Sequence, residues 1–68
     1  MPNPVHKKIE VVGTSGESFA KAAQNAVARA SKSVRNLEWF EVTEMRGRIS
    51  RTKIDQFQVT MKIGFKLE

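Results

Sequence analysis

The sequence predicts an α+β fold in which a three-stranded antiparallel sheet packs on one helix. The last stretch, Phe57 to Leu67, alternates apolar and non-apolar side chains, which is typical of a strand buried on one face. An alanine-rich segment from Phe19 to Val34 repeats its apolar residues at three- and four-residue spacing, as an amphipathic helix does. Two further strands flank that helix in sequence. If the last two strands form a hairpin, the last strand lies centrally and the strand order is 2-3-1.

Length and composition predict one small domain over residues 1–68 that gains stability by self-association. A chain of this size buries only about 60% of its unfolded surface. The sequence has no cysteine and one histidine, which excludes disulfides and thiolate metal sites and predicts no zinc site. Association with copies of itself is the remaining way to stabilise so small a core.

Charge and hydropathy point to a cytoplasmic protein that favours anionic partners. The net charge is +5, from 12 basic and 7 acidic residues. The sequence contains no apolar run near the roughly 18 residues that a membrane span needs. Met1 to Pro4 lacks the apolar core of a signal peptide. We therefore expect no membrane partner.

The first strand is predicted from Val5, where apolar and polar side chains alternate. A turn, Gly13-Thr14-Ser15-Gly16, follows it, and Ser15 or Ser18 is suited to cap the helix. A glycine-rich loop before a helix can also hold phosphate, but we favour a plain turn and cap. The helix is expected to end near Arg35, where basic side chains suit the negative end of its dipole.

The second strand is predicted over Leu37 to Arg48, with Phe40 and Val42 in the core. Strand alternation then places Trp39 on the opposite face. The apolar positions change parity at Met45, which predicts a bulge or strong bend near Gly47. The range 46–53 carries four basic residues and no acidic one, and we expect it to form the hairpin loop.

Trp39 and Gln58 are the candidate binding residues on the uncovered face. A core position is the commoner place for a tryptophan, but Trp39 and Phe40 cannot both face the helix. An exposed indole can stack on a planar aromatic ligand or base. The amide of Gln58 can both donate to and accept from the edge of a heterocycle. The sequence shows no nucleophile with its base, and we expect no enzymatic activity.

The chain resembles the dodecins, small flavin-binding proteins, and specifically their bacterial branch. The resemblance covers nearly the whole length of the chain. It includes the end of the first strand, the end of the helix, the segment around the tryptophan, and the closing strand. The corresponding pieces are Val11-Val12-Gly13-Thr14-Ser15, Ser33-Val34-Arg35-Asn36-Leu37, Trp39-Phe40-Glu41-Val42, Gln58-Val59 and Gly64-Phe65-Lys66-Leu67-Glu68.

The resemblance implies a hollow dodecamer of β-α-β-β protomers that stores flavin and quenches its excited state without turning over a substrate. Trp39 matches a tryptophan that stacks on the isoalloxazine ring, with two flavins between symmetry-related tryptophans at a two-fold axis. Gln58 matches a glutamine that bonds the pyrimidine edge of the ring. The resemblance also implies a preference for FMN over riboflavin, and coenzyme A as a second ligand in some members. Arg46 matches a basic residue near the FMN phosphate, whereas Lys66 stands where an arginine is expected and cannot make a bidentate contact.

Two alternatives belong to other functional classes. A nucleic-acid-binding module would stack bases on Trp39 and use Arg46, Arg48, Arg51 and Lys53 for phosphates. A purely structural oligomerisation unit would bind neither ligand. Quenching of added flavin distinguishes the flavin carrier from both, and for such a carrier we expect no nucleic-acid partner.

Overall fold

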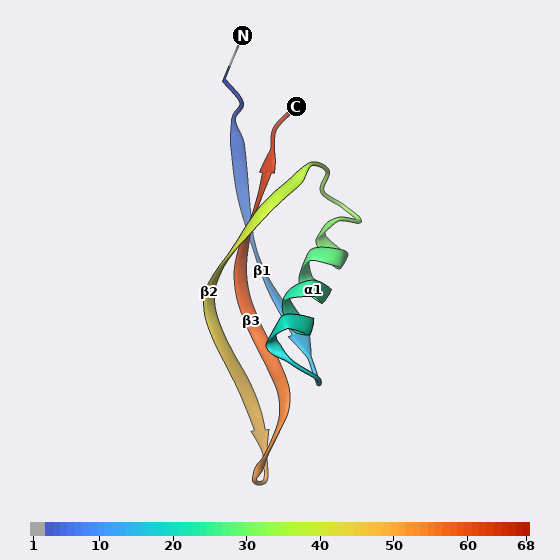
Figure 1. Cartoon of the computed structure of the whole chain (residues 1–68), viewed down its shortest axis with the longest axis vertical. Helices are drawn as coiled ribbons and strands as arrows, with labels where there is room; N and C mark the ends of the chain where they lie inside the picture. The colour runs from blue at the N-terminus through green and yellow to red at the C-terminus, as the bar shows by residue number, and fades with distance from the viewer. Residues whose placement is uncertain (1–2) are drawn as a thin grey trace.

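The computed structural model describes residues 3–68, which form three strands and one helix (Figure 1). In chain order these are β1 (His6–Ser15), α1 (Phe19–Ala30), β2 (Leu37–Ser50) and β3 (Lys53–Lys66). The strands form one antiparallel sheet in the order β1-β3-β2, which confirms the predicted central position of the last strand. Two prolines within Met1 to Pro4 predict a frayed lead-in, and its first two residues, Met1 and Pro2, lie outside the described residues.

The core lies between α1 and the alternating apolar side chains of β3. Val59, Met61 and Ile63 are fully buried and pack against alanines on one face of α1, at positions 22, 26 and 30. Small side chains on the helix and Gly13 on β1 let the two layers approach closely. A Cβ at Gly13 would lie 2.8 Å from the Cβ of Ala26. The alternation read from the last strand is therefore confirmed.

The segments on either side of α1 differ from the prediction. Residues 13–15 were expected to turn, but they extend β1 and pair with β3 as far as Ser15 opposite Phe57. The helix begins after Ser18, whose Oγ accepts a hydrogen bond from the amide of Lys21. It ends at Ala30, five residues before the expected Arg35. The hydroxyl of Ser31 donates to the carbonyl of Ala28 at 2.7 Å, and such local bonds compete with continued helical bonding.

The hairpin between β2 and β3 is tighter than predicted. Residues 46–53 were expected to form a loop, but β2 continues to Ser50 and only two residues separate it from β3. Arg51 adopts a left-handed conformation in that turn, with φ of 60°. The strands remain paired this far because Ile49 faces Ile54, and Arg48 bonds Asp55 at 3.1 Å. The basic residues therefore lie largely on paired strands.

The parity change in β2 is confirmed, but its position was predicted wrongly. The register shifts at three places in β2, between Leu37 and Trp39, between Val42 and Glu44, and between Arg48 and Ile49. The middle shift makes Thr43 the extra residue and changes the parity of the apolar positions. The hydroxyl of Thr43 donates to the carbonyl of Thr60 at 3.2 Å, which ties the irregular segment to β3. Gly47 is regularly paired with Phe57 instead of forming the bulge.

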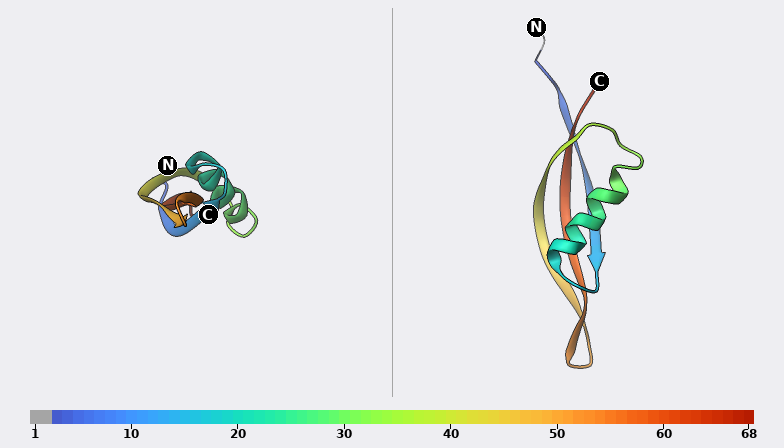
Figure 2. Two further views of the ribbon diagram at one scale, coloured as in Figure 1. Left: turned by 90° about the horizontal axis from the view of Figure 1, so that it is seen from below. Right: turned by 45° about the vertical axis from the view of Figure 1, so that its right-hand side comes forward.

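The helix covers β1 and β3 and leaves β2 to one side (Figure 2). Phe40 and Val42 pair with the core residues Ile63 and Met61 and so lie on the helix side, but they are not buried. Phe40 is 52% exposed. The expectation that they join the core is wrong for one protomer, because α1 lies across β1 and β3 and β2 packs against the core at its first residue, Leu37.

The C-terminus is tied to the segment between α1 and β2. The carboxylate of Glu68 accepts a hydrogen bond from Asn36 at 3.2 Å and lies 3.3 Å from a guanidinium nitrogen of Arg35.

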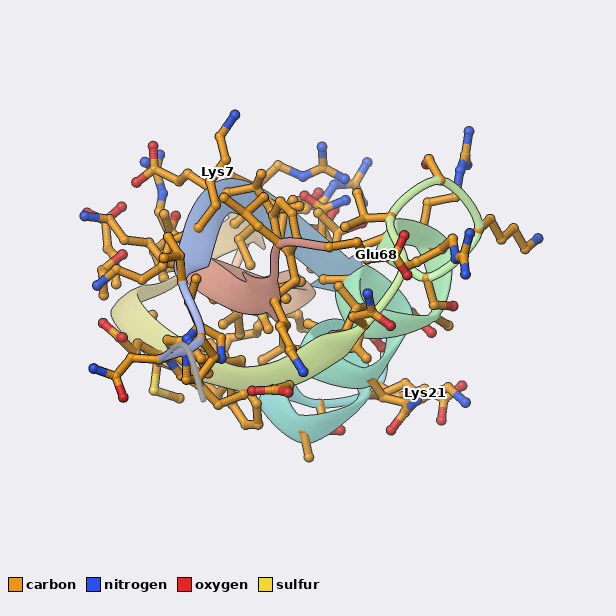
Figure 3. All side chains as sticks on the ribbon, turned by 90° about the horizontal axis from the view of Figure 1, so that it is seen from above. Lys7, Lys21 and Glu68 are labelled. Atoms are coloured by element: carbon orange, nitrogen blue, oxygen red, sulfur yellow. The ribbon has the colours of Figure 1, made fainter. Side chains whose placement is uncertain are left out.

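Lys7 and Lys21, in contrast, point outward from β1 and α1 (Figure 3). Within residues 3–68, no helix is long and apolar enough to cross a membrane.

Candidate functional site

The face of the sheet away from α1 holds the predicted binding residues. On β3 this open face carries Gln58, Thr60, Lys62 and Gly64, which alternate with the buried residues. Trp39 is the direct partner of Gly64, whereas its neighbour Phe40 is the partner of the buried Ile63. The structure thus confirms that Trp39 lies opposite the core, and its side chain remains 38% exposed.

The indole of Trp39 rests on the backbone of Gly64. A Cβ at Gly64 would overlap the benzene part of the indole and lie 2.5 Å from its Cη2 atom. Carbon atoms in ordinary contact are about 3.5–4.0 Å apart, so no other residue at this position leaves the indole where it is. The ring of His6 meets the indole edge-on, with centroids 5.2 Å apart and planes inclined by 62°. One face of the indole is therefore seated on the sheet.

A carboxylate holds the polar end of the indole. Trp39 Nε1–H donates to Oε2 of Glu41 at 2.9 Å. The ammonium of Lys8 lies 3.2 Å from that oxygen and 3.4 Å from Oε1. These contacts, first the indole hydrogen bond and then Lys8, hold the pKa of Glu41 below its ordinary value. Glu41 is thus a carboxylate with two donors on the open face.

Gln58 and Arg46 are direct partners on β3 and β2, so the structure brings these two predicted residues together. The amide nitrogen of Gln58 donates to the side-chain oxygen of Gln56 at 2.8 Å, and Arg46 approaches Glu44 at 3.9 Å. Glu44, the partner of Arg46, is exposed, and Gln56, the partner of Gln58, is half-buried. The pair therefore offers an amide and a guanidinium close to each other near the hairpin.

One protomer does not bring Trp39 and Gln58 together. Gln58 lies six positions before Gly64, the partner of Trp39, along β3. At about 3.3 Å per residue this is a distance of roughly 20 Å. Lys66 is the partner of His6, only two residues beyond Gly64. The predicted residues thus form two groups on the same face, with Trp39 and Lys66 in one and Gln58 and Arg46 in the other.

Trp39 lines one small hollow at the edge of its side chain. The hollow has a volume of about 140 Å³ and is otherwise formed by Val27, Leu37, Glu38, Phe40 and Ile63, most of which lie on the helix side of the sheet. Pockets for drug-sized ligands typically hold about 300–1,000 Å³, so this hollow is too small for such a ligand. On the open face the indole is 38% exposed, and a ligand stacked on it there is enclosed only if a second surface covers it.

Sequence reasoning missed the residues that fix the indole, which are His6, Lys8, Glu41 and Gly64. Their parity places them on the open face, but parity alone does not show which residues are opposite one another. That information comes from the strand register, which puts Lys8 and Trp39 on either side of Gly64. Across residues 3–68, no three side chains of the kinds that bind metals gather at one place.

Comparison with known proteins identifies the family. The family model described as Dodecin matches residues 5–68. A curated dodecin from Thermus thermophilus is 50% identical over 64 residues, which cover 94% of this chain and 93% of the relative.

Solved structures agree with the family match. A Thermus thermophilus crystal structure is 48% identical, covers 97% of both chains and has a TM-score of 0.93. A dodecin from Streptomyces davaonensis is 43% identical, covers 98% of both chains and has a TM-score of 0.95. Because the family model matches residues 5–68 and these relatives cover nearly the whole chain, the chain belongs to the dodecin family.

Proposed function

We propose that this protein binds flavin by stacking the isoalloxazine ring on Trp39. The observation that carries the proposal is an exposed indole with one face seated on Gly64, which leaves its other side available to a planar ligand. Stacking on an indole suits a flat, polarisable heterocycle. Membership in the dodecin family supports a flavin-binding protein of this type.

The complete site is formed between protomers of a hollow dodecamer. Trp39 and Gln58 of one chain are too far apart to contact the same ring, so the Gln58 that bonds the ring edge comes from another copy. Pairs of flavins then lie between symmetry-related tryptophans. The exposed apolar side chains of Phe40, Val42 and Met45 on the helix side of β2 support an assembly that buries them.

FMN and riboflavin are the proposed ligands, with coenzyme A as a second candidate. Arg46 lies beside Gln58 and is held only loosely by Glu44, so it is available to an FMN phosphate. Lys66 lies on β3 two residues after Gly64, the partner of Trp39. Its ammonium provides one positive charge but cannot make a bidentate contact. We assign Arg46 the larger phosphate contribution.

The proposed role is storage and photoprotection in the cytoplasm, with no catalytic step. Electron donation from Trp39 to the excited flavin quenches its fluorescence. The nucleic-acid alternative is not favoured, because Arg48 is engaged with both carboxylate oxygens of Asp55, at 3.1 and 3.3 Å.

Titration of riboflavin fluorescence with the purified protein tests this function. The parent protein should quench the added flavin. Trp39→Ala should lose about 1–3 kcal/mol of binding free energy for each ring face it covers and should restore fluorescence. Gln58→Ala should cost about 0.5–1.5 kcal/mol and leave the bound flavin quenched. Light scattering on each variant shows whether the assembly survives. Equal affinity and quenching in an intact Trp39→Ala assembly would return Trp39 to a structural role.

A further inference from the structure

Glu41 and Lys8 form a chain of contacts that ends on the indole nitrogen of Trp39. The Nε1–H group donates to Oε2 of Glu41 at 2.9 Å, and the ammonium of Lys8 contacts both carboxylate oxygens. Glu41 lies two residues after Trp39 on β2, so strand alternation places both side chains on the open face. The contacts therefore restrain the indole from the edge that carries its only hydrogen-bond donor.

Gly64 makes this arrangement possible. It is the direct partner of both Lys8 on β1 and Trp39 on β2, so it lies between them in the middle strand. Because it has no side chain, the indole can lie over β3 and Lys8 can reach across to Glu41. All three strands thus contribute to holding a single side chain. A tryptophan that only filled space would need neither the carboxylate nor the lysine.

We propose that Glu41 is a positioning residue for Trp39, and that with Lys8 it fixes the indole plane against Gly64 before the ligand arrives. The proposal rests on the proposed flavin-binding function and assigns a role to a residue that does not itself touch the ring. A free indole rotates about two side-chain bonds, and stacking would have to restrict both. A side chain that is already held loses less freedom on binding, which strengthens the affinity.

The test compares Glu41→Ala and Glu41→Gln with the matched control Glu10→Ala. Glu10 is a carboxylate on the same face, opposite the same Lys62 that pairs with Glu41. Because Trp39 is the only tryptophan, the time-resolved anisotropy of its fluorescence reports its local motion directly. Riboflavin affinity, thermal unfolding and light scattering are measured on the same samples.

Glu41→Ala should increase the fast local motion of the indole and raise the riboflavin Kd by about 3- to 10-fold, the range for ordering one mobile side chain. Glu41→Gln should fall between the parent and Glu41→Ala, because its amide oxygen still accepts the indole N–H but has no charge for Lys8. Glu10→Ala should match the parent in both measurements. A purely structural role would instead lower the unfolding temperature or the assembly mass without changing the indole motion.

Two outcomes overturn different parts of the proposal. If Glu41→Ala keeps the parent's anisotropy decay and riboflavin Kd, Glu41 does not position the indole, while flavin binding stands. If the parent itself neither binds nor quenches riboflavin, the proposed function fails, and with it the role of Glu41 in that function.

Discussion

Adding one methyl group at Gly64 should displace the indole of Trp39. The new Cβ would lie 2.5 Å from Cη2 and closer still to Cε2 and Cζ2, whereas carbon contacts need about 3.5 Å, so the ring has to move by at least about 1 Å. A movement of about 1 Å directly away from Glu41 stretches the 2.9 Å bond from Nε1 to about 3.9 Å, beyond hydrogen-bonding range. We expect Gly64→Ala to reduce the free energy of riboflavin binding by at most about 1–3 kcal/mol, which is the contribution of one stacked base.

The strand itself should tolerate the change. Gly64 is paired on both sides and does not have a positive φ, and alanine in a regular strand is about 0.5–1 kcal/mol more favourable than glycine. Fluorescence titration and thermal unfolding are measured together, with Gly16→Ala as the control. At Gly16 the nearest atom to a new Cβ is a carbonyl oxygen 4.0 Å away. A riboflavin affinity of Gly64→Ala equal to that of the parent would refute the claim that contact with Gly64 positions the indole of Trp39.

Three further predictions concern packing, phosphate binding and pH. Gly13→Ala should lower the free energy of unfolding by about 1–3 kcal/mol through overpacking against α1; an unchanged thermal transition would contradict this close approach. Arg46→Ala should remove an FMN preference over riboflavin on the order of 1–3 kcal/mol, measured by paired titrations, and equal affinities in the parent would exclude the phosphate contact. The indole bond and Lys8 lower the pKa of Glu41, so its hold on Trp39 should persist at neutral pH and be lost as the pH falls through that lowered pKa. Anisotropy of Trp39 should show an acid transition that Glu41→Gln lacks; the same transition in that variant would assign it to another group.

The strand order could be predicted because a hairpin between the last two strands leaves the last strand at the centre, and the face of Trp39 could be predicted because it depends on residue alternation. Alternation in β3 fixes which side chains meet α1, and the parity of Phe40 then places Trp39 on the other face. The end of the helix could not be predicted from periodicity. Val34 continues the apolar spacing, but the hydroxyl of Ser31 bonds back to the helix and favours a turn at that point.

The distance between the two parts of the site could not be read from parity. Trp39 and Gln58 share a face, yet their separation depends on the register between β2 and β3, which the extra residue Thr43 alters. The contact between Lys8 and Glu41 likewise crosses all three strands. Such contacts depend on which residues are opposite one another, and a single sequence gives only the side of the sheet on which each lies.

Native mass spectrometry of the protein with added riboflavin tests the central claim most directly, because it measures assembly and flavin content in the same particle. We predict an assembly of twelve 7.7 kDa chains that carries riboflavin, and the same assembly of Trp39→Ala with little or none. Riboflavin bound to isolated protomers, or equal loading of the parent and Trp39→Ala assemblies, would contradict a flavin site built on Trp39 between protomers.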